Sequence, residues 1–163
     1  MKTMAYCLEC GQPISRGVYV FSQRIYGHSL CMKDQYLLEE SGATAHTIDL
    51  YLALKARNFP LVLEYFDGYK HVDMAIPGRL YIEVNGIFQQ ADWEAETDLT
   101  HSIYSLEKKI PTIIITNALL ENPRSFAHVV EELSKACRVM LAPMNDFSMV
   151  FGPAFTAARS TTR

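Results

Sequence analysis

Apolar and polar residues alternate along two neighbouring segments in the middle of the chain, residues 71–76 (HVDMAI) and 80–85 (LYIEVN). Successive side chains of a β-strand point to opposite faces, so each segment has one apolar face and one polar face. The apolar positions are Val72, Met74 and Ile76, then Leu80, Ile82 and Val84. The polar positions are His71 and Asp73, then Glu83 and Asn85. Pro77-Gly78 is a turn signal between the segments, so the pattern predicts a β-hairpin.

The hydrophobic pattern predicts further helices and strands around this hairpin. The expected helices cover residues 45–58, residues 91–109 and the segment after Asn122-Pro123, and the expected strands cover residues 61–66 and 111–116. Cys137 falls on the apolar stripe of the last helix, and we interpret it as a packing residue. The predicted order is α-β-β-β-α-β-α, and the fold class is α/β (α+β).

The composition is that of an ordinary globular protein. The chain has 163 residues, of which 49% are hydrophobic and 20% charged, and its net charge is −3. No apolar run approaches the roughly 20 residues of a membrane span, and the N-terminus lacks the apolar stretch of a signal peptide. We therefore expect a cytoplasmic protein without membrane contact, whose cysteines serve metals or chemistry. The net charge does not exclude nucleic acid as a partner, because a local basic groove can coexist with an acidic remainder.

Three of the four cysteines lie close together near the start of the chain. The pair Cys7 and Cys10, in a C-x2-C spacing, is followed by His28 and Cys31 in an H-x2-C spacing. Two such pairs supply the four ligands of a tetrahedral zinc site. Residues 17–29 between the pairs are predicted to form a β-hairpin, and residues 32–40 a short helix. Three buried cysteines with a surface histidine are the alternative interpretation.

This arrangement resembles the first zinc-binding half of a LIM domain, a treble-clef zinc finger, and places a small zinc module in residues 1–40. A LIM domain would continue with further cysteines, whereas this chain has Asp34, so the resemblance implies a single zinc ion. Asp34 stands in C-x2-D register with Cys31 and is an alternative to His28 as the fourth ligand. So short a segment has little core, and we therefore expect the zinc to be structural.

The order of elements after residue 44, with an acid on the second and third strands, resembles the PD-(D/E)xK, or restriction-endonuclease-like, nuclease fold. The resemblance covers residues 44–138 and leaves residues 139–163 as a C-terminal tail. The stretches YFDGYKHVDMAIP, RLYIEVNG, TDLTHSIYSL and PTIIITN look like relatives of the very-short-patch-repair endonucleases. The resemblance implies an αβββαβα endonuclease-like core that hydrolyses phosphodiester bonds, with DNA as the expected nucleic-acid partner.

In this nuclease class the acids on the second and third strands hold Mg²⁺ or Mn²⁺, and the matching residues here are Asp73 and Glu83. Carboxylate oxygens suit Mg²⁺, which takes the rest of its shell from water and phosphate. A lysine two residues after the glutamate usually orients the attacking water. Asn85 stands at that position, without charge or useful basicity. Taken alone, the two acids also fit the solvated face of an antiparallel sheet, which the pattern slightly favours.

Other polar positions of the nuclease pattern are changed as well. Gln89 stands where these relatives have a histidine, and His101 where they have an arginine. His71, which shares a strand face with Asp73, and His101 are candidates to replace the missing catalytic groups. Lys70 is a further candidate for the cation, but strict alternation points it away from Asp73.

Two functions are consistent with these residues. The first is a Mg²⁺-dependent endonuclease, guided to DNA by its zinc module and acting as a homodimer where two strands are cut. The second is a catalytically degenerate nuclease fold that binds nucleic acid or protein. Asp73 and Glu83 favour the first function. Asn85, Gln89, His101 and the acidic net charge favour the second.

Overall fold

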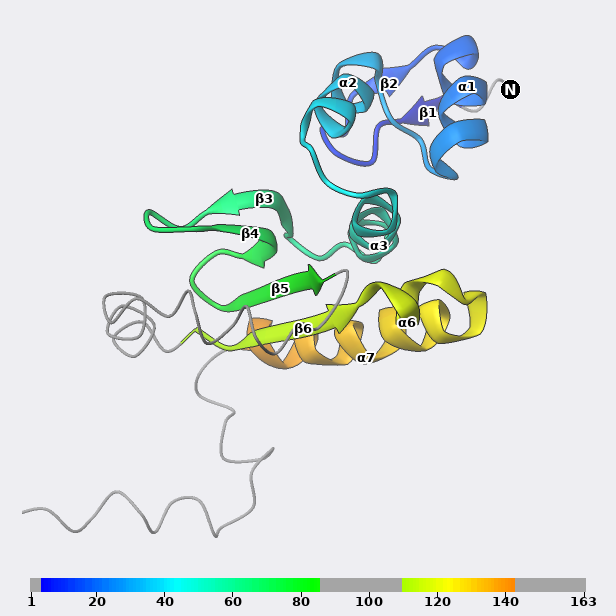
Figure 1. Ribbon diagram of the computed structural model, residues 1–163. Helices are drawn as coiled ribbons and strands as arrows, with labels where there is room; N and C mark the ends of the chain where they lie inside the picture. The colour runs from blue at the N-terminus through cyan, green and yellow to red at the C-terminus, as the bar shows by residue number, and fades with distance from the viewer. Residues whose placement is uncertain (1–3, 86–109, 143–163) are drawn as a thin grey trace, which may run out of the picture.

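The structure, a computed structural model, describes residues 4–85 and 110–142. A short strand pair and two helices form an N-terminal module (residues 4–43), which is followed by a four-stranded sheet and three helices (Figure 1). The elements of the module are β1 (Ala5–Tyr6), β2 (Pro13–Ile14), α1 (Arg16–Tyr26) and α2 (Met32–Glu40). The others are α3 (Ala45–Lys55), β3 (Val62–Phe66), β4 (His71–Ile76), β5 (Leu80–Asn85), β6 (Thr112–Thr116), α6 (Asn117–Glu121) and α7 (Pro123–Leu141). The described chain is therefore a mixed α/β structure, as predicted.

The hairpin predicted over residues 17–29 is wrong, because this segment forms helix α1. Ser15 is its N-cap, and the Ser15 side chain accepts a hydrogen bond from the Val18 N–H. Gly27 ends the helix in the left-handed conformation, at φ 67°. A serine cap and a glycine stop are helix signals, and they outweigh the strand-like alternation of Val18 and Val20.

Strands β3 to β6 form one mixed sheet in that spatial order. β3, β4 and β5 are antiparallel neighbours, which confirms the predicted hairpin over residues 71–85. β6 pairs with β5 in parallel, from Tyr81↔Thr112 to Asn85↔Thr116. Among the described strands, β3 is thereby an edge strand with one unpaired side. The short helix α6, between β6 and α7, is not predicted by the sequence pattern.

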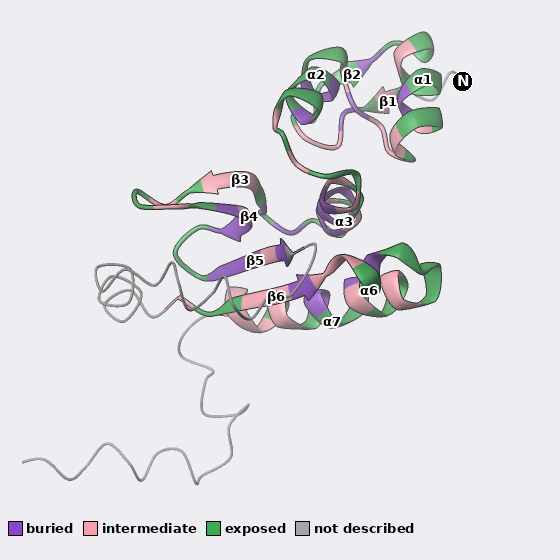
Figure 2. Cartoon of the chain, in the orientation of Figure 1, coloured by how far each residue is buried: buried purple, intermediate pink, exposed green. Residues whose placement is uncertain are grey.

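One face of the sheet packs against α3 and α7 and forms the main core (Figures 1 and 2). This core includes Met74, Ile82, Val84 and Ile115 of the sheet with Leu50, Leu54, Val130, Leu133 and Cys137 of the helices. Cys137 is fully buried, as its predicted packing role requires, and burial raises its pKa to about 11. The same core continues into the N-terminal module through Cys7, Ile14, Leu30 and Leu38.

Two sequence predictions lie wholly or largely outside the described residues. The first is the helix over residues 91–109. The second is the tail from residue 139, of which only the start, at the end of α7, is described. Within residues 4–85 and 110–142, no helix is both long enough and apolar enough to cross a lipid bilayer.

Candidate functional site

Four side chains with metal-ligand chemistry converge in the N-terminal module: Cys7, Cys10, Cys31 and Asp34. Their ligand atoms all lie within 4.8 Å of one another, and no other group of three or more such ligands in the described chain is this close. Asp34 Oδ2 is 3.1 Å from the Sγ atoms of both Cys7 and Cys31. The Sγ atoms of Cys10 and Cys31 are 3.9 Å apart. The four side chains are thus within reach of a single metal ion.

The local backbone explains how these ligands meet. Cys7 follows β1 and begins a tight turn. The Cys7 N–H donates to the Gln12 carbonyl at 2.8 Å and closes this turn, which places Cys10 beside Cys7. Cys31 is the N-cap of α2, and Asp34 lies in the first turn of that helix. The i, i+3 spacing places both on one side of the helix. The Cys31 N–H donates to Cys7 Sγ at 3.2 Å, which joins the turn to the helix.

Asp34, and not His28, is the fourth member of this group. His28 is partly buried in the connection between α1 and α2. Burial lowers the pKa of His28, and the negative charge of Asp49 opposes that shift. The geometry therefore favours the alternative ligand set, in which Asp34 follows Cys31 by three residues.

The chemistry of the donor set fits a zinc ion. Thiolate sulfur and carboxylate oxygen are both zinc ligands, and structural zinc sites are four-coordinate. Burial raises the pKa of the Cys7 and Cys31 thiols, so they keep their protons at neutral pH when no metal is bound. Burial also acts to raise the pKa of Asp34, but hydrogen bonds from the thiols outweigh it and leave that pKa lowered. Metal binding must displace the thiol protons, so it is coupled to pH.

A second candidate site lies where β4 and β5 separate. Their backbone pairing ends at Met74↔Ile82. Beyond that pair, the Val84 N–H donates to Asp73 Oδ2 at 2.5 Å, and the Asp73 N–H donates to Glu83 Oε2 at 3.4 Å. Two carboxylates therefore replace the ladder hydrogen bonds at this point. The acids predicted as a pair are thus adjacent in the structure, and both are partly buried.

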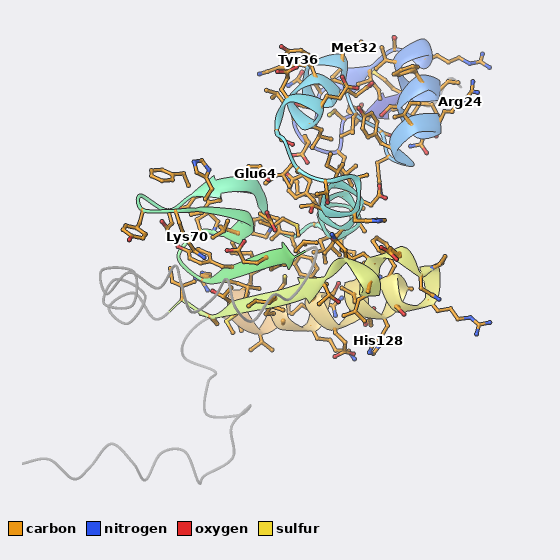
Figure 3. All side chains as sticks on the ribbon, in the orientation of Figure 1. Arg24, Met32, Tyr36, Glu64, Lys70 and His128 are labelled. Atoms are coloured by element: carbon orange, nitrogen blue, oxygen red, sulfur yellow. The ribbon has the colours of Figure 1, made fainter. Side chains whose placement is uncertain are left out.

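A lysine joins this pair from the turn between β3 and β4 (Figure 3). Lys70 Nζ lies 2.8 Å from Glu83 Oε1. Asp67 fixes the turn by accepting hydrogen bonds from the N–H groups of Tyr69 and Lys70, at 2.8 and 2.9 Å. The predicted orientation of Lys70 away from Asp73 does not keep Lys70 out of this group, because its partner is Glu83. Strand alternation does not hold in a turn, and the long side chain of Lys70 reaches Glu83 from there.

Glu64 adds a third carboxylate from β3. The pairing of its two neighbours in β3 places it opposite Asp73, and its own φ is 48°. Burial raises the pKa of Glu64, and the negative charges of Asp73 and Glu83 raise it further. Burial also raises the pKa of Asp73, against the effect of the Val84 N–H. The sequence could have indicated Glu64 through the turn at residues 67–70. In a hairpin with this turn, residues at equal distances from the turn lie opposite one another, so position 64 pairs with position 73.

The other residues predicted for this site are placed differently or lie beyond the described chain. His71 is exposed, and its ring packs on Phe66 with 4.9 Å between ring centroids. Asn85 is the last residue of β5. Gln89 and His101 lie outside the described residues. The roles predicted for His71, Asn85, Gln89 and His101 stay predictions.

The acids offer hard oxygen ligands to a divalent cation. Mg²⁺ is commonly held by one or two carboxylates, with water and substrate phosphate completing its shell. Asp73 and Glu83 fit that pattern, because they are adjacent and partly buried. No third ligand from the described chain joins them closely enough to complete a cage. A metal ion here would therefore depend on ligands from outside the described chain, such as water, for the rest of its shell.

Comparisons with known protein families, with curated proteins and with solved structures find no match to this chain. The thiol cluster and the acids at the β4–β5 separation are the two parts of the described chain with the chemistry of a functional site. The thiol cluster could hold a metal ion such as zinc. The acids and Lys70 are the groups in the described chain that could take part in metal-assisted catalysis.

Proposed function

We propose that the protein is a nuclease that hydrolyses phosphodiester bonds of DNA with a divalent metal ion, and that zinc stabilises its N-terminal module. The observation that carries this proposal is the convergence of Asp73, Glu83 and Lys70 where β4 and β5 separate. Two carboxylates beside an ammonium group are a suitable set for metal-assisted phosphoryl transfer. The proposal keeps the restriction-endonuclease-like core as the expected architecture.

Lys70 takes the role that Asn85 cannot fill in this proposal. An ammonium group stabilises charge that develops on phosphate oxygens, whereas an amide carries no charge. The ion pair with Glu83, at 2.8 Å, holds Lys70 beside the acids before substrate binds. A Mg²⁺ ion at the two carboxylates supplies Lewis-acid chemistry, by polarising a phosphoryl oxygen and lowering the pKa of bound water. Glu64, with its raised pKa, is a candidate to accept the proton of the attacking water.

A cleavage assay tests this function. Zinc-loaded protein is incubated with supercoiled plasmid and with single-stranded DNA in Mg²⁺, Mn²⁺ or EDTA, beside Asp73→Asn, Glu83→Gln and Lys70→Met. Glu132→Gln is the matched control, because Glu132 pairs with Lys135 at an exposed position on α7. We expect metal-dependent cutting that the control retains and that each cluster variant loses by about 100-fold or more. No cutting of either substrate by folded, zinc-loaded protein would contradict the proposal.

A second function, binding without catalysis, is favoured by one observation. The carboxylates of Asp73 and Glu83 already accept backbone N–H groups, which is a structural use of both acids. In that case the protein is a catalytically degenerate nuclease fold that binds nucleic acid or another protein. DNA binding that weakens steeply with added salt, without cleavage in any metal, would identify this function.

A further inference from the structure

The N-terminal module meets the rest of the chain along a cleft of about 380 Å³. The lining residues from the module include Glu9, Asp34 and Leu38, and those from beyond it include Tyr51, Lys55 and Leu61. Two of them belong to the thiol cluster or its turn. Asp34 is one of the four ligands, and Glu9 lies between Cys7 and Cys10.

One salt bridge crosses this boundary within the described parts of the chain. Lys55 Nζ, at the end of α3, lies 3.2 Å from Glu9 Oε2. The two side chains are 17% and 18% exposed, so the pair is largely shielded from water. Lys55 Nζ also lies 5.7 Å from the centroid of the Tyr51 ring, one helical turn earlier on α3. The ammonium group is thus held between its own helix and the turn that carries two of the thiols.

The position of Glu9 depends on the turn from Cys7 to Cys10. Both ends of that turn carry ligands, so a bound zinc ion would fix them against Cys31 and Asp34. Without metal, the weak contacts among thiols and carboxylate, such as the 3.9 Å separation of the Cys10 and Cys31 Sγ atoms, are a poor substitute. The module has few buried apolar residues to hold the turn by packing alone.

We propose that zinc binding docks the N-terminal module onto α3, because ligation fixes the turn that presents Glu9 to Lys55. Zinc affinity and docking are then thermodynamically coupled, so each strengthens the other by the same factor. The cleft, whose lining also includes Val62 and Leu63 of β3, keeps its observed form in the zinc-loaded protein and widens when zinc is removed. The thiol cluster would then set the relation between two parts of the molecule, beyond stabilising its own module.

Zinc affinity of the full-length chain, measured by competition with a chromophoric chelator, tests the coupling from one side. We expect Lys55→Met to lower the affinity by about 3- to 5-fold. A direct charge effect has the opposite sign, because removing a positive charge near the cluster favours binding of a cation. Lys135→Met, which breaks the exposed pair with Glu132 on α7, is the matched control and should leave the affinity unchanged. Unchanged or increased affinity in Lys55→Met would overturn the proposal.

Hydrogen exchange of the full-length chain tests the coupling from the other side. We expect amides of α3 to lose protection when zinc is chelated, and Lys55→Met to show part of that loss even when zinc is bound. Equal protection of α3 with and without zinc would overturn the proposal, as would failure of the wild-type chain to bind zinc. Neither measurement involves DNA, so the proposed docking and the proposed nuclease function can fail separately.

Discussion

At the scale of single residues, Asp34 gives the thiol cluster an uncommon set of metal ligands. Structural zinc sites are usually built from four cysteines or from cysteines with histidines. Here a carboxylate of α2 completes the set, while His28 of the same sequence motif stays outside it. Spacing identified both candidates but could not choose between them. The choice depends on the helix start at Cys31, which turns position 34 towards the thiols.

Replacing each candidate ligand separates the two ligand sets. We expect Asp34→Ala to lower zinc affinity by at least about 10-fold. Loss of a residue that only hydrogen-bonds a metal ligand already costs about 10-fold, and loss of a ligand itself should cost no less. His28→Ala should leave the affinity nearly unchanged. Chelator competition on both variants measures the difference. A larger loss in His28→Ala than in Asp34→Ala would contradict the geometry of the cluster.

Asp73 makes a prediction about pH. Its folded-state pKa is raised from 3.8, so the folded protein holds this proton more tightly than the unfolded chain does. The stability that this gives is fully present below pH 3.8 and is lost as the pH rises through the raised pKa. Asp73→Asn avoids the loss and can still accept the Val84 N–H. We therefore expect the variant to be more stable than wild type at pH 7 in EDTA, with the gain shrinking towards pH 4.

Urea unfolding at both pH values measures this gain, and lower stability of Asp73→Asn at pH 7 would contradict it. Added Mg²⁺ should stabilise the wild type and not the variant, because the variant lacks one of the two proposed metal carboxylates. A site that costs stability until its ligand binds is typical of functional residues.

At the scale of elements, α1 shows where the hydrophobic pattern misleads. The alternation near its start is compatible with a strand, and its outer face leaves Val20, Phe21 and Ile25 more than half exposed. The end signals, Ser15 and Gly27, identify the helix more reliably than its apolar positions do. Because these apolar residues are exposed, the burial of α1 does not follow its apolar positions.

Two glycines of this segment give opposite predictions. Gly27 has φ 67°, and nothing lies near the position of an added Cβ, so Gly27→Ala should cost about 1 kcal/mol from backbone conformation alone. Gly17 lies inside the helix with equal free space, so Gly17→Ala should stabilise the protein by about 0.5–1 kcal/mol. Urea unfolding of the zinc-loaded variants gives both values. Equal effects of the two substitutions would argue against a helix here.

The alternation of β4 and β5 was predictable because the face with Met74, Ile82 and Val84 is buried in the main core. The strand β6 was predictable from its continuous apolar run instead. Short turns between β3, β4 and β5 fixed their antiparallel pairing. The interruption beside Asp73 could not be predicted, since it depends on side chains replacing backbone partners. The contact of Lys70 with Glu83 could not be predicted for a related reason, because the alternation rule does not extend into a turn.

At the scale of the whole molecule, one hydrophobic core is shared by parts that contribute unequal numbers of buried residues. The sheet together with α3 and α7 contributes most of its buried residues, whereas the N-terminal module contributes Cys7, Ile14, Leu30 and Leu38. We therefore expect EDTA to make the module susceptible to protease while residues 71–76 and 80–85 stay protected. Limited proteolysis with mass spectrometry measures this. Cleavage in both regions at equal rates would show that zinc supports the whole fold instead.

The parallel pairing of β5 with β6 also has a consequence for how the chain folds. β3, β4 and β5 are joined by short turns, but β6 starts only at Thr112, far along the chain from the end of β5 at Asn85. Closing a longer loop costs more entropy, so the antiparallel strands should associate first and β6 should add later. Until then, the β6 side of β5 is an open edge that can pair with another chain. Newly made protein would accordingly be most prone to aggregate before β6 has joined the sheet and α7 has packed against it.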